Sequence, residues 1–371
     1  MSDEKIRLGD VATYINGYAF KPEDRGNEGL PIIRIQDLTG NSYDLGFYNG
    51  DYSKKIEIND GDILISWSAS LGVYIWDKGK ALLNQHIFKV LFDKAPIDKQ
   101  YFVYAVRYKL AEMDTKTHGA TMKHIVKKDF DATQIPYPSI KEQKNIALKL
   151  NKVSYIIEAR QQELKNLDQL IKVRFVEMFG DPKYNKTNIT KIGDIGTLTS
   201  GGTPSRAKPE YFEGKIRWYS AGELNSLYLP DSIEHISETA LRESSAKLFG
   251  KGTLMIGMYD TAAFKMGILT ENASSNQACA NLNPKSGYNV IWLYYLFDIM
   301  KPIFLKKRQG VRQKNLSLSK IKGFEVPNAS IELQTQFAAF VEQVNKSKVV
   351  VQKSLEETQL LFDSLMQKYF G

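Results

Sequence analysis

The sequence predicts an α+β protein made of two pseudo-twofold-related α+β globular domains and two long antiparallel helices that form a coiled coil. Two observations predict this fold. The chain repeats itself internally, and each copy closes with apolar residues at heptad spacing. In chain order the predicted segments are a first domain (1–138), a first long helix (139–180), a second domain (181–329) and a second long helix (330–371).

The internal repeat consists of short matches that occur in the same order in both halves of the chain. The spacing starts near 184 and settles at 191 (310 − 119), far beyond the roughly 20–50 residues of a solenoid repeat. The sequence therefore predicts two whole units, about 1–184 and 185–371, from a duplicated domain. The matched pairs include Gly9-Asp10 with Gly193-Asp194, Asn84-Gln85 with Asn276-Gln277, Gly119 with Gly310, Lys123 with Lys314, Pro136 with Pro327, Gln143 with Gln334 and Phe179-Gly180 with Phe370-Gly371.

Each globular domain shows strand and helix patterns together. Apolar runs after Gly-containing turns, at 63–67 and 254–256, predict strands. Longer apolar segments at 99–113 and 289–307 predict helices. A mixed α+β domain follows, without a predicted strand order.

The long helices begin after prolines, Pro138 in the first copy and Pro327 in the second. Ser139 and Glu142 form a capping-box pattern, of which the second copy keeps only Ser330. Each long helix would be about 38 residues, roughly 57 Å, with an apolar stripe along it, so one helix would bury the other's stripe. The alternative is that each helix packs only on its own domain. The two stripes are Ile146, Leu150, Val153, Ile157, Leu164, Leu167, Ile171 and Met178, and Phe337, Val341, Val344, Val351, Leu355, Phe362, Leu365 and Tyr369.

The net charge of +8 is uneven. Residues 1–184 hold 27 basic and 25 acidic residues, and residues 185–371 hold 23 and 17. Between Asp298 and Glu325 there are eight Lys or Arg and no acid, a segment that would attract a polyanion such as DNA. The alternative is a solvated surface helix. With no secretory signal, no apolar run long enough to cross a membrane and one cysteine, we expect a cytoplasmic protein that does not bind membranes.

Catalytic signatures are absent from the sequence. There is no phosphate loop, no methyltransferase Asn-Pro-Pro-aromatic run and no zinc-ligand spacing among the four histidines. Cys279 stands among small apolar residues, and its counterpart in the first unit is Ile87, so an inert core thiol is expected. We therefore expect no catalytic residue, no metal site and no cofactor bound by this chain.

The chain resembles the specificity subunit of type I restriction–modification systems. The resemblance covers essentially the whole chain, and its short motifs become specific through their order and duplication. They are Leu8-Gly9-Asp10, Asn84-Gln85, the run from Pro136 to Gln143, and Phe179-Gly180-Asp181-Pro182, in tandem units that each end in a long helix.

The resemblance implies that each domain is a target-recognition domain for one half of a split, asymmetric double-stranded DNA site. The paired helices would be a ruler and the docking surface for two copies of a methyltransferase subunit. Those subunits would bring S-adenosylmethionine and methylate a flipped adenine. A separate motor-nuclease subunit would bring ATP and Mg²⁺. The nearly neutral first unit departs from this picture and would rely more on its partners for phosphate contacts.

Residue types and loop positions suggest which side chains would meet DNA. Basic residues would contact phosphates, and polar or aromatic residues in loops after strands would approach bases. The predicted contacts are Tyr18, Phe20, Lys21, Trp67, Ser68, Lys123, Lys127, Lys128, Thr203, Ser205, Arg206, Tyr259, Lys306, Lys307, Arg308, Arg312 and Lys314. Asn84-Gln85 and Asn276-Gln277 either contact DNA or cap a turn, and their presence in both units favours the turn.

The stripe residues would hold the rod together and so present the partner-docking surface, in particular Ile157, Leu164, Leu167, Ile171, Val344, Val351, Leu355 and Phe362. Three other functions stay open. A stand-alone DNA-binding regulator would bind DNA tightly without a methyltransferase, and a coiled-coil scaffold would show no salt-dependent DNA binding. A nuclease is disfavoured because no cluster of carboxylates with a lysine recurs in both units.

Overall fold

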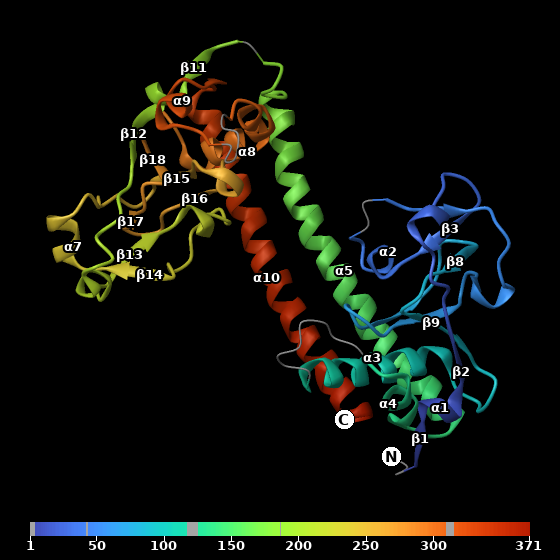
Figure 1. Cartoon of the computed structure of the whole chain (residues 1–371). Coiled ribbons are helices and arrows are strands. Elements are labelled where there is room, and N and C mark those ends of the chain that lie inside the picture. The colour runs from blue at the N-terminus through green and yellow to red at the C-terminus, as the bar shows by residue number, and fades with distance from the viewer. Residues whose placement is uncertain (1–3, 42–43, 117–124, 186, 309–314) are drawn as a thin grey trace. The chain divides into compact units, whose positions relative to one another are not determined.

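A computed structural model describes residues 4–41, 44–116, 125–185, 187–308 and 315–371 (Figure 1). The chain divides into two compact units. Unit 1 contains residues 1–161 and 354–371, and unit 2 contains residues 162–353. Each unit therefore takes part of both long helices, α5 (Ile140–Phe179) and α10 (Ile331–Phe370).

Unit 1 is built on two four-stranded sheets. The main sheet has the order β2-β9-β6-β7, all antiparallel, and the smaller sheet has the order β4-β3-β8-β5. The ribbon β1–β10 closes the domain beside α5. The elements are β1 (Lys5–Arg7), α1 (Leu8–Val11), β2 (Thr13–Asn16), β3 (Leu30–Ile33), α2 (Ile35–Leu38), β4 (Phe47–Tyr48), β5 (Glu57–Ile58), β6 (Ile63–Ser66), β7 (Gly72–Ile75), β8 (Ala81–Leu83), β9 (Ile87–Leu91), α3 (Lys99–Lys116), α4 (Lys127–Ala132) and β10 (Gln134–Pro136), with 3-10 turns η1 (Pro22–Asp24) and η2 (Lys54–Ile56).

Unit 2 repeats this plan. Its main sheet has the order β12-β18-β15-β16, a smaller sheet has the order β14-β13-β17, and β11 pairs with β19. The elements are β11 (Ile189–Lys191), α6 (Ile192–Ile195), β12 (Gly196–Ser200), η3 (Pro209–Phe212), β13 (Ile216–Tyr219), η4 (Ala221–Glu223), β14 (Glu234–Ile236), α7 (Glu238–Glu243), β15 (Leu254–Gly257), η5 (Asp260–Ala262), β16 (Met266–Ile268), β17 (Ser274–Ser275), β18 (Cys279–Pro284), α8 (Val290–Lys306), α9 (Leu318–Lys322) and β19 (Glu325–Pro327).

The connectivity of the main sheet is the same in both units, and so is the parallel pair in the smaller sheet, β3 with β8 and β13 with β17. The predicted duplication is therefore confirmed at the level of topology. The predicted strands at 63–67 and 254–256 are β6 and β15, and the predicted helices at 99–113 and 289–307 are α3 and α8.

Each unit closes its core with the end of one long helix and the start of the other. In unit 1, Ile146 and Leu150 of α5 share a core with α3 and with Tyr369 and Phe370 of α10. In unit 2, Phe175 of α5 is fully buried, and its ring lies 5.2 Å from that of Phe337 in α10. The helix pair is thus antiparallel, as predicted, and each helix also packs on a globular core.

The predicted stripe is confirmed as the buried face of these helices. Ile157, Ile171, Val344 and Val351 are at most 9% exposed, and Leu164, Leu167, Leu355 and Phe362 are partly buried. Phe175 was not in the predicted stripe because Arg174 and Met178 marked the heptad positions there. Ser139 Oγ accepts a hydrogen bond from the Glu142 amide at 3.3 Å, which is the serine half of the predicted capping box. Among the described residues, no helix is long and apolar enough to cross a membrane.

The repeated glutamine links each long helix to its domain. Gln143 and Gln334 are fully buried. Gln143 donates to the Pro138 carbonyl at 2.8 Å and accepts from the Asp98 amide at 2.9 Å. Gln334 donates to the Ala329 carbonyl and accepts from the Asn289 amide, both at 2.8 Å. The same side chain therefore fixes the residue that precedes α3 in unit 1 and α8 in unit 2.

Candidate nucleic-acid interface

Three loops meet at one end of the main sheet in unit 1, and we call them the unit 1 rim: residues 16–21, 67–71 and 84–86. Tyr18 forms a β-bridge with Asn84, and the Trp67 amide donates to the His86 carbonyl at 3.3 Å. After α3, the chain returns to this rim through the Ile125 amide, which donates to the Trp67 carbonyl at 3.0 Å. The rim is thus one hydrogen-bonded structure.

Unit 2 has the equivalent loops at the equivalent end of its sheet, and we call them the unit 2 rim: residues 200–206, 258–262 and 276–278. The Met258 amide donates to the Ala278 carbonyl at 2.9 Å, and the Leu316 amide donates to the Met258 carbonyl at 2.8 Å. The second bond matches that of Ile125 to Trp67 at the repeat spacing of 191. Both rims therefore have the same backbone plan.

The repeated Asn-Gln pair is the turn that organises each rim. Asn84 Oδ1 accepts from the Gln85 amide at 2.9 Å, and Asn276 Oδ1 accepts from the Ala278 amide at 3.0 Å. The predicted turn-capping role of the asparagines is confirmed. The glutamines differ from the asparagines in exposure, because Gln85 and Gln277 are both exposed at the tip of their turns. Their repeated identity was visible in the sequence, but their exposure was not.

Each rim also contains a left-handed residue that is not glycine. Ala69 has a φ of 58° and Asp260 a φ of 45°, and the two positions are 191 residues apart. Residues other than glycine rarely adopt this left-handed backbone conformation. Where they do, the surrounding structure holds them in it, often at functional sites. In unit 2 the Arg308 guanidinium donates to the Asp260 carbonyl at 3.4 Å, and the Asp260 amide donates to Asn315 Oδ1 at 3.0 Å. The loop shape has therefore been kept in both copies despite different side chains.

A basic groove lies beside the unit 2 rim. It has a volume of about 540 Å³ and runs between the end of α8 and α9. Lys306 and Lys307 are exposed, and the Lys307 ammonium lies 5.4 Å from the centre of the Phe324 ring. A groove with this lining would hold an anion such as a phosphate group. Its lining residues are Lys306, Lys307, Arg308, Lys320, Gly323 and Phe324.

Comparison with known proteins shows the family. A sequence model for the family described as "Type I restriction modification DNA specificity domain" matches residues 3–169 and again 185–358. The chain belongs to this family. As a member it is a specificity subunit of a type I restriction system, a part that recognises DNA, assembles with partner subunits and carries out no catalytic step.

Individual relatives agree with the family match. The specificity subunit of the type I restriction enzyme EcoBI from Escherichia coli is 29% identical over 407 residues, which span 99% of this chain and 85% of the relative. The MjaIX specificity subunit from Methanocaldococcus jannaschii is 29% identical over 178 residues, 46% of this chain and 41% of the relative.

Solved structures share the fold. The S subunit of the type I restriction–modification system from M. genitalium has a TM-score of 0.57 at 17% identity, covering 99% of this chain and 96% of that one. A structure described under complex assembly and conformational transition of the type I R-M system has a TM-score of 0.61 at 14% identity, covering 99% and 97%. The two-unit α+β fold predicted from the sequence is thus the fold of specificity subunits.

In the first specificity domain, the predicted DNA contacts fall into two groups. Tyr18 is 54% exposed, with its ring 5.0 Å from that of Phe20, which is buried. Trp67 stacks on Phe88 at 5.5 Å and donates from Nε1 to Asn16 Oδ1 at 3.2 Å. Tyr18 is exposed to solvent, whereas Phe20 and Ser68 are buried and Trp67 is partly buried.

Among the described residues, the predicted basic contacts of unit 1 are Lys21, Lys127 and Lys128, and all three are exposed. Lys21 precedes η1, and its amide donates to Asp24 at 2.7 Å. Lys127 forms an ion pair with Asp131 at 2.5 Å, and Lys128 has no ion pair with any described residue. Three predicted contacts lie outside the described residues: Lys123, Arg312 and Lys314.

In the second specificity domain, the arginine predicted to read bases is already hydrogen-bonded within the domain. Arg206 donates both guanidinium arms to Glu234, and its Cζ lies 4.2 Å from the centre of the Phe212 ring. This bonding lowers the pKa of the Glu234 carboxyl, because Arg206 stabilises its charged form. The Thr203 hydroxyl donates to the exposed side chain of Gln277, and Ser205 and Tyr259 are exposed. Arg206 therefore stabilises its own loop, which belongs to the unit 2 rim.

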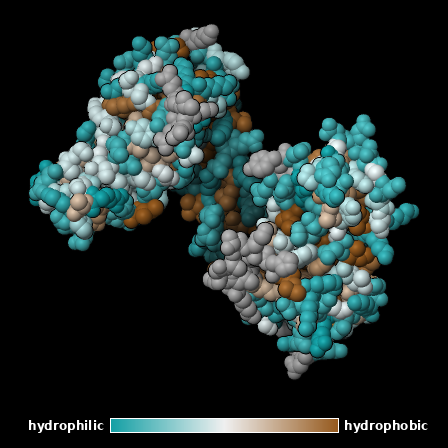
Figure 2. Space-filling view, viewed as in Figure 1, coloured by the Kyte–Doolittle hydropathy of each residue, from teal (hydrophilic) through white to brown (hydrophobic). Residues whose placement is uncertain are grey.

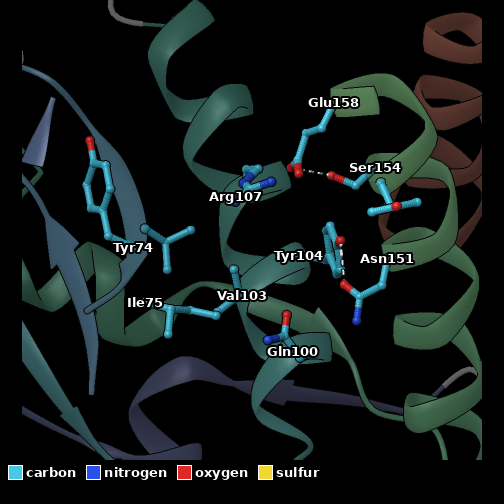
Figure 3. Close-up of a pocket in the computed structure, with 11 residues that line it drawn as sticks. Tyr74, Ile75, Gln100, Val103, Tyr104, Arg107, Asn151, Ser154 and Glu158 are labelled. Carbon is cyan, nitrogen blue, oxygen red and sulfur yellow. Dashed lines mark hydrogen bonds between the residues drawn. The ribbon is translucent and has the colours of Figure 1, made fainter. Parts of the chain in front are cut away.

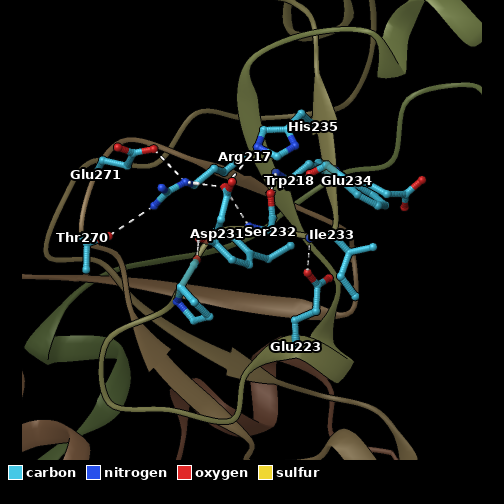
Figure 4. Close-up of polar contacts among 12 residues, drawn as sticks. Arg217, Trp218, Glu223, Asp231, Ser232, Ile233, Glu234, His235, Thr270 and Glu271 are labelled. Carbon is cyan, nitrogen blue, oxygen red and sulfur yellow. Dashed lines mark hydrogen bonds and ion pairs between the residues drawn. The ribbon is translucent and has the colours of Figure 1, made fainter. Parts of the chain in front are cut away.

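A second arginine of unit 2 is held in the same way, as Figure 4 shows. Arg217 of β13 pairs with Asp231 and with Glu271, both at 2.8 Å. His235 contacts Asp231 from the other side, at 3.1 Å. This cluster carries more acid than base, which disfavours phosphate there. The basic groove is the better electrostatic match for DNA in unit 2.

Cys279 is fully buried in β18, and burial raises the pKa of its thiol to about 12. The prediction of an inert core thiol is confirmed, since a protonated, buried sulfur is not a nucleophile at neutral pH.

Proposed function

We propose that the two units read the two halves of one split, asymmetric DNA site, each through its rim. The observation that carries the proposal is the pair of rims, which share hydrogen bonds, the Asn-Gln turn and the left-handed residue. Their exposed side chains differ, with Tyr18 and Lys21 in one and Ser205 and Tyr259 in the other. A constant backbone with variable side chains would present different base-reading groups from the same position.

Gln85 and Gln277 are proposed as the DNA contacts that both half-sites share. Each stands exposed on a turn whose neighbour is anchored, Asn84 or Asn276. A glutamine amide both donates and accepts, so it can pair with an adenine edge or with a phosphate and sugar. Because both units keep the residue, we assign it to something common to both half-sites.

Phosphate binding is proposed for the basic groove in unit 2, with Lys306, Lys307 and Lys320 as its exposed or partly exposed cations. Lys21, Lys127 and Lys128 would be the weaker counterpart in unit 1. Lys127 already pairs with Asp131, so it would contribute less than an unpaired lysine. This difference supports a larger share of phosphate contacts from partner subunits at the first half-site.

We further propose that the outer faces of α5 and α10 dock two copies of a methyltransferase subunit. That subunit would supply S-adenosylmethionine, and a motor-nuclease subunit would supply ATP and Mg²⁺. Apolar residues on these faces are unusually exposed: Tyr155 is 72% exposed, Val349 and Val350 are 69% and Leu360 is 67%. Figure 2 shows hydrophobic residues at the surface where the long helices are visible. Such residues favour a protein partner.

The experiment is deletion of this chain's gene, followed by long-read sequencing of methylated adenines. The expected result is the loss of one split, asymmetric methylation motif, which returns on complementation. Complementation with Gln85→Ala or Gln277→Ala should weaken methylation of the whole motif. Unchanged methylation after deletion would refute the proposal and favour the stand-alone regulator.

A further inference from the structure

The outer edge of the main sheet is covered in unit 2 by a segment of the chain itself. Residues 227–229 run alongside β16, where Tyr228 forms a parallel bridge with Ile268. The Ile268 amide donates to the Leu227 carbonyl at 2.8 Å, and the Leu229 amide donates to the Ile268 carbonyl at 3.0 Å. These bonds satisfy the outward-facing backbone groups of the edge strand.

The covering segment fits closely. A Cβ at Gly267 would lie 2.2 Å from Leu229 Cδ2, so the approach of this segment requires a glycine in β16. The Tyr228 hydroxyl donates to Glu342 of α10, and burial with this carboxylate raises the tyrosine pKa. Tyr228 and Glu342 line a cavity of about 440 Å³ with Ile268 and Ile291. The segment therefore adds a short strand and one aromatic side chain to a groove between β16, α8 and α10.

Unit 1 has the same groove at the equivalent place. Ile75 of β7 pairs with Ile63, as Ile268 pairs with Leu254, so Ile75 is the structural counterpart of Ile268. Its groove has a volume of about 540 Å³ and lies between β7, α3 and α5. Asn151 and Gln100 line it at the positions of Glu342 and Ile291, which are 191 residues further along the chain.

In unit 1, no residue that the structure describes covers this edge. Neither the amide nor the carbonyl of Ile75 is hydrogen-bonded to any residue that the structure describes. The Ile75 side chain is 41% exposed and that of Tyr155 is 72% exposed. Figure 3 shows Tyr74 of β7 directed away from the groove, so this tyrosine does not fill it. An uncovered edge next to apolar side chains is a template for another strand.

The groove in unit 1 is also lined by a positively charged side chain, Arg107. Arg107 of α3 is exposed and forms no ion pair with any described residue, and its Cζ lies 5.6 Å from the centre of the Tyr104 ring. Arg107 also lines an adjoining cavity of about 450 Å³ with Gly72, at the start of β7. An added parallel strand could place a tyrosine opposite Ile75. The residues two or three positions before that tyrosine would then lie opposite Arg107.

We propose that the β7 edge of unit 1 is a docking site for an extended segment of a partner protein. The segment takes the place that Leu227–Leu229 takes in unit 2, adding a parallel strand through the amide and carbonyl of Ile75. It carries an aliphatic–tyrosine–aliphatic sequence, preceded by a carboxylate that pairs with Arg107. The edge strand that unit 2 covers with its own residues 227–229 is thus covered in unit 1 by a segment of another protein.

The probe is a synthetic peptide with the sequence of residues 225–231, labelled with a fluorophore and titrated with the full-length chain in an anisotropy measurement. We expect saturable binding to one site. A peptide carrying Asn225→Asp should bind about two- to fivefold more tightly, as expected for one exposed ion pair. The Arg107→Ala variant of the protein should lose that gain and still bind the unmodified peptide.

Ile75→Pro is the decisive variant of the protein. It removes the outward amide that would donate to the added strand, and a proline is tolerated at an edge strand because the inward bonds are untouched. Peptide binding should weaken about tenfold, the upper range for one lost hydrogen bond. Far-UV circular dichroism and DNA affinity should match those of the unmodified chain, which separates this result from misfolding and from loss of DNA recognition.

Three outcomes would overturn the proposal. No saturable binding up to about 1 mM peptide would leave the groove without the affinity expected of a specific site. Equal binding to Ile75→Pro and to the unmodified chain would place the peptide elsewhere. Dimerisation of the chain that Ile75→Pro abolishes would identify a second copy as the occupant.

Discussion

Replacing Gln143 with alanine should loosen the start of α3 and leave unit 2 intact. The side chain is fully buried and makes two hydrogen bonds, to the Pro138 carbonyl at 2.8 Å and from the Asp98 amide at 2.9 Å. Asp98 in turn accepts from the Tyr101 amide at 3.0 Å, so it caps α3. Gln143→Ala leaves the part-buried Asp98 amide and the buried Pro138 carbonyl unpaired, at a cost of about 2–4 kcal/mol.

Hydrogen–deuterium exchange of α3 measures this cost locally. Since about 1.4 kcal/mol is a factor of ten, the amides of the first turn of α3 should exchange roughly 30- to 700-fold faster. Gln334→Ala should transfer the effect to α8, because Gln334 makes the equivalent bonds. Gln161→Ala, at an exposed position of α5, is the matched control. Unaltered α3 exchange in Gln143→Ala, or an equal change in α8, would refute this account of the repeated glutamine.

Three further predictions follow from the described contacts. Lys307→Ala with Lys320→Ala should lower the slope of log Kd against log salt for DNA binding by about 1.8, at about 0.9 per phosphate contact, whereas the exposed Lys215→Ala should leave it unchanged. Phe175→Ala should lower the free energy of unfolding of unit 2 by about 3–5 kcal/mol in urea, read from tryptophan fluorescence, and a loss below 1 kcal/mol would contradict its burial against Phe337. Cys279 should resist maleimide at pH 8 until urea unfolds the chain. Because folding raises the thiol pKa from 9.0 to about 12, its contribution to stability is complete below pH 9 and is lost between pH 9 and 12, a decline that Cys279→Ala should lack.

The sequence was informative where the duplication made a pattern visible twice. Gln143 and Gln334, the Asn-Gln turns and the helix stripes all recur at one spacing, and all have the same structural role in both units. Strand order was not predictable, because partners such as β2 and β9 lie about 75 residues apart (88 − 13) and their register depends on tertiary packing.

Base-reading residues were the hardest to predict, because a side chain's availability depends on distant partners. Arg206 stands in a loop after a strand, yet Glu234, 28 residues later, holds its guanidinium. Trp67 ends a strand as an exposed reader would, but its ring packs on Phe88. Gln85 and Gln277 were set aside with their asparagines because both units share them, and only the structure separates an anchored Asn from an exposed Gln.

The way unit 1 completes its core has a consequence for synthesis on the ribosome. Its core includes Met366, Tyr369 and Phe370, whereas unit 2 is one continuous segment, 162–353. Domains generally fold in the order in which they are made. Here the first-made domain waits, with part of its apolar surface uncovered, until more than 190 further residues have been translated (353 − 161 = 192). The second-made domain is finished first, and translation of the end of α10 then completes the first domain.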